Sequence, residues 1–586
     1  MAEQTRRRTV FTSKKAALAI LPFLPLLYLV ALIARYGVDV PFADEFTFAP
    51  LLEKAHAGTL TVADLFAQHN EHRYFFTRLL FIGLAFAFQG NLRAEMFFSV
   101  FLALLAGANL WWLLRKTAIS TSAQTLLLCL FSLLLFSPVQ AENWIWGFQF
   151  PLFFCNFLFT CGLVAAFSGL NPGKKFALCG AIALIASFSF GGGVLLWVLT
   201  FPLGLLIHRE ITWKTMTAWL VAWGAVAAAT MALYFFHYVK PPYHPHIAAS
   251  RNPVDYFLYV TTFLGAHLSR AARSEPIFQA ALVGTVLLVL WSVAVAYAFR
   301  HRQDFELRRR ILPWVALGSY AILNAVLAAA ARIGFGVSQA LDSRYTSFSL
   351  YLGGATAALI VILKHEVYSR TASRRFEGAI VRLETILLTA FAVLTLTAFS
   401  WGRSFMIESQ GTRLWGKGAL LFSNVMETGE IHDRYLMANA PEARAYANTL
   451  DKIGLLHPSM LRTAEIAQLK TKQHPDLGFV DFITTAGSSC SVVGWAILPG
   501  TSTRAHCVIL SYEDPARGAV AFRVADEIHN RPDVAAVLKK PAAEASGWTC
   551  HFDRSILPAG DIVVSAWAMD ANHAILYQLG TPKLLH

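Results

Sequence analysis

The sequence predicts an α-helical polytopic membrane protein of about eleven spans, followed by a C-terminal all-β sandwich domain. Its apolar residues, 56% of the chain, fall in separate runs of about 18 to 24 residues. This length crosses a hydrocarbon layer of ~30 Å at 1.5 Å per residue. Charged residues make up only 15% of the chain and its mean hydropathy is +0.50, which disfavours one large soluble core.

Eleven spans follow from these apolar runs, two of them sharing residues 176–207 around a possible turn at "SFGGG". The others cover residues 16–36, 94–114, 121–139, 148–169, 214–236, 276–299, 311–331, 346–364 and 383–401. The first run is too long for a cleaved signal peptide and no small-residue cleavage site follows it. We therefore expect an uncleaved first span.

The segment 73–90 is apolar but contains Arg73 and Arg78. We expect it to form an amphipathic helix at the membrane surface rather than a span. This choice keeps the basic loops on one side of the membrane, as the positive-inside rule requires. Those loops include "LLRKT", "PGKK", "HREITWK", "RHRQDFELRRR" and "KHEVYSRTASRR".

The net charge of +13 therefore belongs to loops beside the spans and does not indicate nucleic-acid binding. The basic N-terminus is expected in the cytoplasm, and an odd number of spans places the C-terminal domain on the periplasmic or extracellular side of a plasma (inner) membrane. The loop 237–275, expected outside, also carries Arg and Lys and departs from the rule.

Three regions are expected: a transmembrane domain at 1–401, a helical extracytoplasmic linker at 402–473, and a β-sandwich at 474–586. Short β-branched and aromatic runs separated by Gly, Pro, Asp and Asn predict the sandwich. Lipid cannot host an open sheet edge, so this domain must lie outside the membrane. Its three cysteines, Cys490, Cys507 and Cys550, would permit one disulfide with one thiol left over.

The span centres carry almost no ionisable residues, which instead collect at the expected outer ends of the helices. Ion-coupled transporters accept the cost of charge at mid-membrane. The sequence therefore predicts a site at the outer membrane surface, within the loop 37–93 and its neighbours, for a substrate that is part lipid and part polar.

Asp44 and Glu45 in "FADEF" are the candidate catalytic residues. A carboxylate beside the low-dielectric interface, with a second carboxylate next to it, becomes a better base at neutral pH. The alternative is a pair of solvated loop charges. The apolar and aromatic residues around the pair favour a loop that folds back onto the membrane.

The cluster "HNEHR" supplies His69, Glu71, His72 and Arg73 as candidate substrate-binding residues. Together with Asp44 or Glu45 it could bind a divalent metal, although no cofactor is certain because the spacing is not diagnostic. The alternative is a polar cap on the surface helix, with Arg73 reaching the interface.

Two further motifs lie at expected outer ends of spans. In "ENWIWGFQF", Glu142 could orient a hydroxyl, and Trp144 and Trp146 belong either to an interfacial aromatic belt or to a sugar-stacking surface. A second motif, "ARIGFGVSQALDSRYTSF", holds Arg332, Arg344 and Tyr345. Arginine presents planar donors that match phosphate oxygens. The alternative is that Arg332 and Arg344 only extend to the membrane interface.

These elements suit one reaction. A carboxylate activates an acceptor hydroxyl, while arginines hold the lipid-linked phosphate that leaves a sugar.

The chain over about residues 15–400 resembles the GT-C superfamily of membrane glycosyltransferases. The resemblance rests on "FADEF" in the place of the acidic pair, on the following interfacial helix, on "SPVQAENWIWGFQF" and on "DSRYTSF". It implies inverting transfer from a polyprenyl-phosphate sugar to a cell-surface glycan, lipid or protein acceptor, with Asp44 as base. The "HNEHR" cluster departs from the family pattern. The tail resembles β-sandwich modules of bacterial glycan-modifying proteins, in a glycan-binding or a structural role.

Two other functions stay open on the sequence: a transporter or flippase of lipid-linked saccharides, and a non-catalytic membrane assembly protein. A transporter of this kind often has inverted repeats and helix breaks at mid-membrane. The sequence shows no such duplication, and "SFGGG" is the one candidate break.

Overall fold

A computed structural model describes residues 20–247, 249–250, 252–270, 275–370, 374–500 and 503–585. The basic residues 6–8 and 14–15 and the first four residues of the expected first span lie outside the described residues. The chain forms two compact units. Unit 1 comprises residues 1–37, 61–81 and 94–406, and unit 2 comprises residues 38–60, 82–93 and 407–586.

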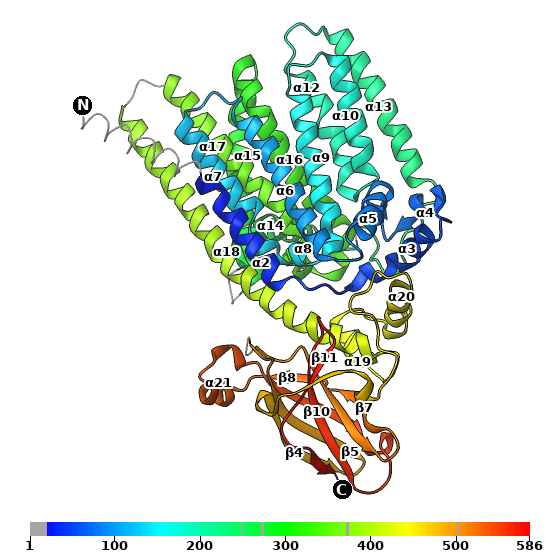
Figure 1. The fold of residues 1–586 in the computed structure, drawn as a ribbon. Helices are drawn as coiled ribbons and strands as arrows, with labels where there is room; N and C mark the ends of the chain where they lie inside the picture. The colour runs from blue at the N-terminus through cyan, green and yellow to red at the C-terminus, as the bar shows by residue number, and fades with distance from the viewer. Residues whose placement is uncertain are drawn as a thin grey trace, which may run out of the picture. The chain divides into compact units, whose positions relative to one another are not determined.

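Unit 1 is a helical bundle (Figure 1). Its helices are α2 (Leu24–Tyr36), α4 (Val62–Phe66), α6 (Arg93–Leu114), α7 (Thr121–Leu135), α8 (Ala141–Ile145), α9 (Phe150–Ala166), α10 (Pro172–Ser187), α11 (Leu196–Leu199), α12 (Phe201–Leu205), α13 (Trp213–Phe235), α14 (Pro253–Ser269), α15 (Pro276–Arg300), α16 (Phe305–Arg332) and α17 (Thr346–Arg370). Unit boundaries fall within α5 (Phe75–Ala87) and α18 (Arg374–Phe422), and another follows Arg93, the first residue of α6.

Eight helices in the described ranges are long and apolar enough to cross a membrane, and they overlap the eight spans expected outside 16–36 and 176–207. Those two regions hold shorter apolar helices instead, at Leu21–Tyr36 and Gly191–Leu205. The apolar helices indicate a membrane protein, as expected. The number of eleven spans stays a prediction.

Burial differs strongly among these helices. Within the apolar window of α17, 94% of residues are buried, against 17% for both α13 and α15. A helix that is apolar all round and buried occupies the centre of a bundle, whereas an apolar helix with little burial has its surface left for lipid. Helix α17 is therefore the core of unit 1.

The sequence predicts a loop over residues 237–275, but helix α14 occupies the second half of this segment. It packs along α15 through two glycines, Gly265 and Gly284. A Cβ at Gly265 would lie 1.9 Å from the Ala280 carbonyl oxygen, and a Cβ at Gly284 would lie 1.8 Å from that of Thr261. Only glycine permits this close backbone approach, a common way for membrane helices to pack.

The expected turn at "SFGGG" is present. Helix α10 ends at Ser187 and a 3₁₀ helix, η5, covers Gly191–Leu195. A Cβ at Gly193 would lie 2.0 Å from the carbonyl oxygen of Ala186, so the chain can fold back here only with glycine.

The helical part of unit 2 combines the first half of the loop after α2 with residues from beyond 407. It contains η2 (Ala43–Phe48), α3 (Ala49–His56), α19 (Gly429–Tyr435) and α20 (Ala440–Lys452). Phe46 and Ala49 share a buried cluster with Leu436 and Ala447. The expected start of a separate linker at 402 falls inside the 49-residue helix α18.

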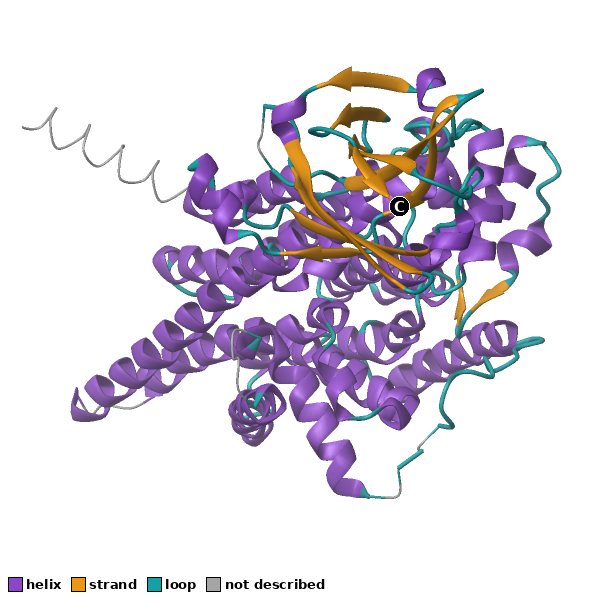
Figure 2. Cartoon of the chain, turned by 90° about the horizontal axis from the view of Figure 1, so that it is seen from below, coloured by secondary structure: helices purple, strands orange, loops and turns teal. Residues whose placement is uncertain are grey.

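The C-terminal part of unit 2 is β-rich, with its strands in orange in Figure 2. The strands are β3 (Lys470–Gln473), β4 (Gly478–Ala486), β5 (Ser489–Ala496), β6 (Cys507–Asp514), β7 (Gly518–Val524), β8 (Glu527–His529), β9 (Gly547–Asp553), β10 (Ile562–Asp570), β11 (Ile575–Gln578) and β12 (Lys583–Leu585). One sheet has the order β3-β11-β10-β6-β7, with β12 also on β10, and the other has the order β4-β5-β9-β8. All pairs are antiparallel except β3 with β11.

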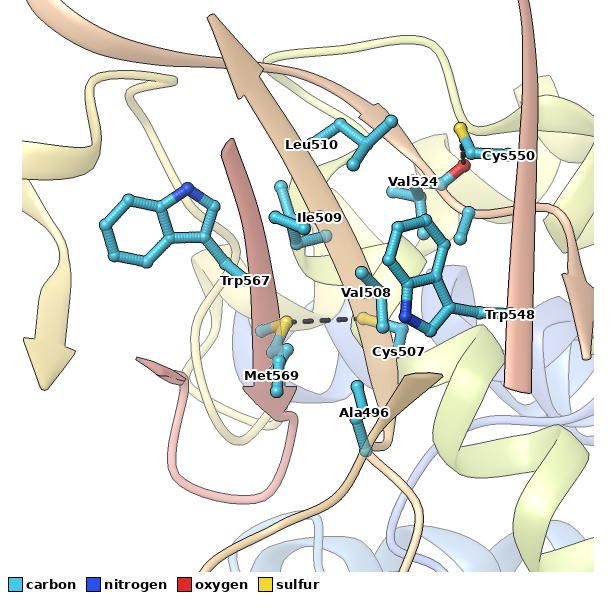
Figure 3. Packing of buried hydrophobic residues seen from close by; sticks show 14 of the residues in the cluster. Ala496, Cys507, Val508, Ile509, Leu510, Val524, Trp548, Cys550, Trp567 and Met569 are labelled. Carbon is cyan, nitrogen blue, oxygen red and sulfur yellow. Dashed lines mark hydrogen bonds between the residues drawn. The ribbon is translucent and has the colours of Figure 1, made fainter. Parts of the chain in front are cut away.

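Residues from both sheets contribute to one buried cluster, shown in Figure 3. Trp548 of β9 and Val508 of β6 are both at most 1% exposed. The Cys507 thiol lies 3.6 Å from the Met569 sulfur, and the Cys550 thiol lies 3.7 Å from the Val524 carbonyl oxygen. All three cysteines of this region, Cys490, Cys507 and Cys550, are free thiols, so the disulfide that the sequence would permit is not formed.

Candidate functional site

A two-strand hairpin carries the "HNEHR" residues in unit 1. Strands β1 (Gln68–His69) and β2 (His72–Arg73) leave Asn70 and Glu71 at the turn, and Asn70 has the left-handed backbone that such a turn requires (φ 49°). The Tyr234 hydroxyl donates a hydrogen bond to the Glu71 carbonyl oxygen at 2.8 Å. The turn is therefore fixed, and the Glu71 side chain projects from an ordered position.

Arg73 anchors this hairpin. Its guanidinium donates to the carbonyl oxygens of Tyr234 (3.1 Å), Phe66 (3.0 Å) and Phe236, and it lies 4.8 Å from the centre of the Phe66 ring. A buried arginine that satisfies three carbonyls is accounted for by structure alone. Its expected role in substrate binding stays a prediction.

Glu71 is the centre of the first cluster. Its carboxylate forms an ion pair with Arg332, at the end of α16, and lies 3.4 Å from His244 Nδ1. The His244 Nε2 atom is in turn 3.0 Å from the Arg332 guanidinium. His72 Nε2 lies 3.8 Å from the same carboxylate. The structure thus brings together Glu71, His72 and Arg332, which the sequence named in two separate motifs.

The two histidines of the hairpin are packed among aromatic rings. His69 stacks on Tyr74 and tilts against Phe148, with 5.5 Å between ring centres in both pairs. His72 lies 4.6 Å from the Phe190 ring. A Cβ at Gly191 would come within 3.0 Å of the His72 ring, which is why glycine follows Phe190 at this point.

The second cluster forms where residues 139–143 meet residues 343–347. The Ser343 hydroxyl donates to the Val139 carbonyl oxygen at 2.9 Å, and the Glu142 N–H donates to the Ser343 hydroxyl at 3.2 Å. The Asn143 amide donates to the Arg344 carbonyl oxygen at 3.0 Å and to the Ser347 hydroxyl at 2.7 Å. These bonds fix the ends of two motifs that lie some 200 residues apart in sequence.

Arg344 is held by acids in this cluster. Its guanidinium donates to the Asp342 carboxylate at 2.7 Å, and the charge of Glu142 also acts on it. Arg332 and Arg344 lie close enough for their charges to interact, which links the two clusters. Arg270 faces the same acids: burial holds its pKa below the ordinary value, and the charges of Asp342 and Glu142 oppose that shift.

The aromatic candidates near this cluster are packed. Tyr345 stacks on Phe263 at 5.2 Å between ring centres. Trp144 is 0% exposed, donates to the Ser137 carbonyl oxygen at 2.9 Å and stacks on Phe153. Trp146 is 6% exposed. Contact of a sugar with either indole would require these surroundings to rearrange, so sugar stacking stays a prediction and packing accounts for both residues.

Asp44 and Glu45 belong to unit 2 and are described there. They lie in the first turn of η2, where the Glu45 carboxylate accepts the Phe42 N–H at 2.8 Å and so caps the turn. Asp44 is half-buried. The residue before it, Ala43, has a left-handed backbone (φ 47°) fixed by a bond from its N–H to the Leu436 carbonyl oxygen at 2.8 Å. The two adjacent acids thus have different surroundings, and the carboxylate of Glu45 caps η2.

Among the described residues, no group of three or more His, Cys, Asp or Glu side chains has the arrangement of a metal site. The predicted metal ligands of the hairpin are engaged otherwise: Glu71 with Arg332, and the two histidines with aromatic rings.

The sequence interpretation missed three residues of these clusters. His244 lies in "PPYHPHI", where nothing distinguishes it from His246. Asp342 stands two residues before Arg344 in the motif already noted, so that acid–arginine spacing was a usable signal. Arg270 follows α14, the helix that the sequence did not predict.

No family model matches the chain, and no curated protein matches it.

Proposed function

We propose that this chain is a membrane glycosyltransferase that moves a sugar from a polyprenyl phosphate to an acceptor hydroxyl at the membrane surface. The observation that carries the proposal is that two arginines, Arg332 and Arg344, lie near each other at the ends of apolar helices in unit 1. Each is oriented by a carboxylate, Glu71 or Asp342. Preorganised guanidiniums of this kind stabilise a departing phosphate.

The proposed reaction proceeds by inversion. A carboxylate takes the proton from the acceptor hydroxyl, and the oxygen attacks the anomeric carbon of the sugar. The bond from that carbon to the phosphate oxygen breaks, and the electron pair leaves with the polyprenyl phosphate. Arg332 and Arg344 would balance the charge that develops on the leaving phosphate.

Asp44 is the proposed base. It is favoured over Glu45 because the Glu45 carboxylate is engaged in capping η2. The left-handed Ala43 next to it adds support, since backbone strain outside glycine is enriched at functional sites. Within unit 2 we further propose that the two sheets form a β-sandwich module outside the membrane.

A reconstituted transfer assay tests the proposal. Purified protein in liposomes is supplied with a labelled polyprenyl-phosphate sugar and a soluble glycan acceptor. Asp44→Asn should abolish transfer, while Glu53→Gln, an exposed acid of α3 that pairs with Lys452, should keep it. Normal transfer by Asp44→Asn would remove Asp44 as the base. Movement of the lipid-linked saccharide across the bilayer without any new glycosidic bond would favour a flippase instead.

A further inference from the structure

A small pocket lies in unit 1 where α6 and α9 end and α16 begins. It has a volume of about 50 Å³, and its lining includes Lys116, Arg309 and Arg310 together with Trp112 and Phe167. A space of this size holds several water molecules or one phosphate group, and is too small for an acyl chain.

The cations of this pocket have few acids to balance them. Arg310 pairs with Glu366, whereas within the described ranges Lys116 and Arg309 form no ion pair with a carboxylate. Lys116 instead places its amine 5.1 Å from the centre of the Trp112 ring, a cation–π contact that holds the amine beside the pocket.

Lys175 of α10 adds a fourth positive charge. Its side chain is 0% exposed, and its amine has no hydrogen-bond partner in the described part of the chain. Its charge acts on that of Arg309, so the two lie near each other. Four cations (Lys116, Lys175, Arg309 and Arg310) against one acid (Glu366) leave an excess of three positive charges, 4 − 1. Lys116 and Arg309 are exposed, so most of this positive charge lies at the surface of the helix ends, where an anion can reach it.

The position of the pocket indicates the source of that counter-charge. Three candidate spans end or begin at it: α6 at Leu114, α9 at Ala166 and α16 at Phe305. The ends of membrane helices lie at the level of the lipid headgroups, where basic pockets between helices bind anionic headgroups. Trp112 beside Lys116 fits the same level, since tryptophan is enriched there.

We propose that this pocket binds the phosphate group of an anionic membrane phospholipid. Arg309 and Lys116 donate hydrogen bonds to the phosphate oxygens, and the acyl chains lie outside against the exposed apolar surface of the bundle. The lipid supplies the negative charge that the chain itself lacks at this place. This site is independent of the proposed transferase chemistry.

Native mass spectrometry of the full-length protein tests this proposal. The protein is released from nanodiscs that contain equal amounts of phosphatidylglycerol and phosphatidylcholine. We expect the wild type to retain phosphatidylglycerol preferentially. The double variant Lys116→Ala/Arg309→Ala should retain it about thirtyfold more weakly, since each of the two cations near a headgroup contributes about a fivefold factor and the two factors multiply. Arg309→Lys keeps the charge and should lose less.

Arg115→Ala is the matched control, because Arg115 is an exposed neighbour of Lys116 that does not line the pocket. It should retain phosphatidylglycerol like the wild type. Equal losses in Arg115→Ala and in the double variant would show general surface attraction and overturn the proposal. Equal retention of both lipids by the wild type would do the same. Displacement of phosphatidylglycerol by millimolar inorganic phosphate would assign the pocket to a free anion instead of a lipid.

Discussion

Helix α16 carries arginines near both of its ends, and the two ends have opposite surroundings. At its start, Arg309 and Arg310 line a pocket together with Lys116, and one of these three cations, Arg310, pairs with an acid. About 35 Å further along the helix, Arg332 is paired with Glu71 beside His244. The chain neutralises one end with its own carboxylate and leaves the other positive. An arginine paired with a carboxylate of the same chain is preorganised, whereas a cation without such a carboxylate can bind an anion from outside the chain.

The largest expected effect concerns the paired end. Arg332→Ala should lower the transfer rate by about 100-fold to 1000-fold, because a preorganised donor to the leaving phosphate is lost. The rate is measured in the liposome assay with saturating donor. Arg302→Ala, which removes an exposed cation just before the start of α16, serves as control and should transfer at close to the wild-type rate. If Arg332→Ala and Arg302→Ala lost transfer rate equally, Arg332 would have no specific role in the reaction.

A smaller effect is expected from the glycine turn that contacts α16. A Cβ at Gly192 would lie 2.6 Å from the side-chain oxygen of Asn324, on α16. Gly192→Ala should therefore lower the free energy of unfolding by about 1–3 kcal/mol, through a steric clash in a packed interior. Thermal unfolding in detergent measures this loss. Gly224→Ala in α13, where a Cβ meets nothing within 4 Å, should be neutral or slightly stabilising.

The smallest expected effect sharpens the charge comparison at the start of α16. Glu366→Gln removes the acid that pairs with Arg310, so it should lower stability by about 1 kcal/mol and increase retention of anionic lipid. Thermal unfolding and native mass spectrometry measure the two changes. Glu306→Gln is the control: its pair with Arg209 is exposed, so the loss should be within about 0.5 kcal/mol. Unchanged lipid retention in Glu366→Gln would argue against the excess of charge as the cause of binding.

Much of the helical architecture could be predicted, because the length and hydropathy of an apolar run follow directly from the thickness of a membrane. The run 94–114, for example, is α6 at Arg93–Leu114. Helix α14 could not be predicted in this way. Its residues include Thr261, Thr262 and His267, which are buried by neighbouring helices and not by lipid, so their polarity conceals the helix from a hydropathy argument.

The candidate site could be predicted only in its parts. The residue types in "HNEHR" and "DSRY" indicated charge clusters, but the sequence cannot show that Glu71 meets Arg332, 261 residues away. Nor does it show which of two adjacent acids caps a turn, since that depends on the backbone of η2 and the bond from the Phe42 N–H to Glu45. Such contacts are set by tertiary packing, which a local pattern does not contain.

The three thiols of the β-rich region give that region a built-in reporter. Cys490, Cys507 and Cys550 are each 0% exposed, and burial raises the pKa of all three. Because the thiolate is the reactive form, these cysteines should resist alkylating reagents while the sheets stay closed. Pulse labelling with a maleimide would then time the opening of this part of the molecule.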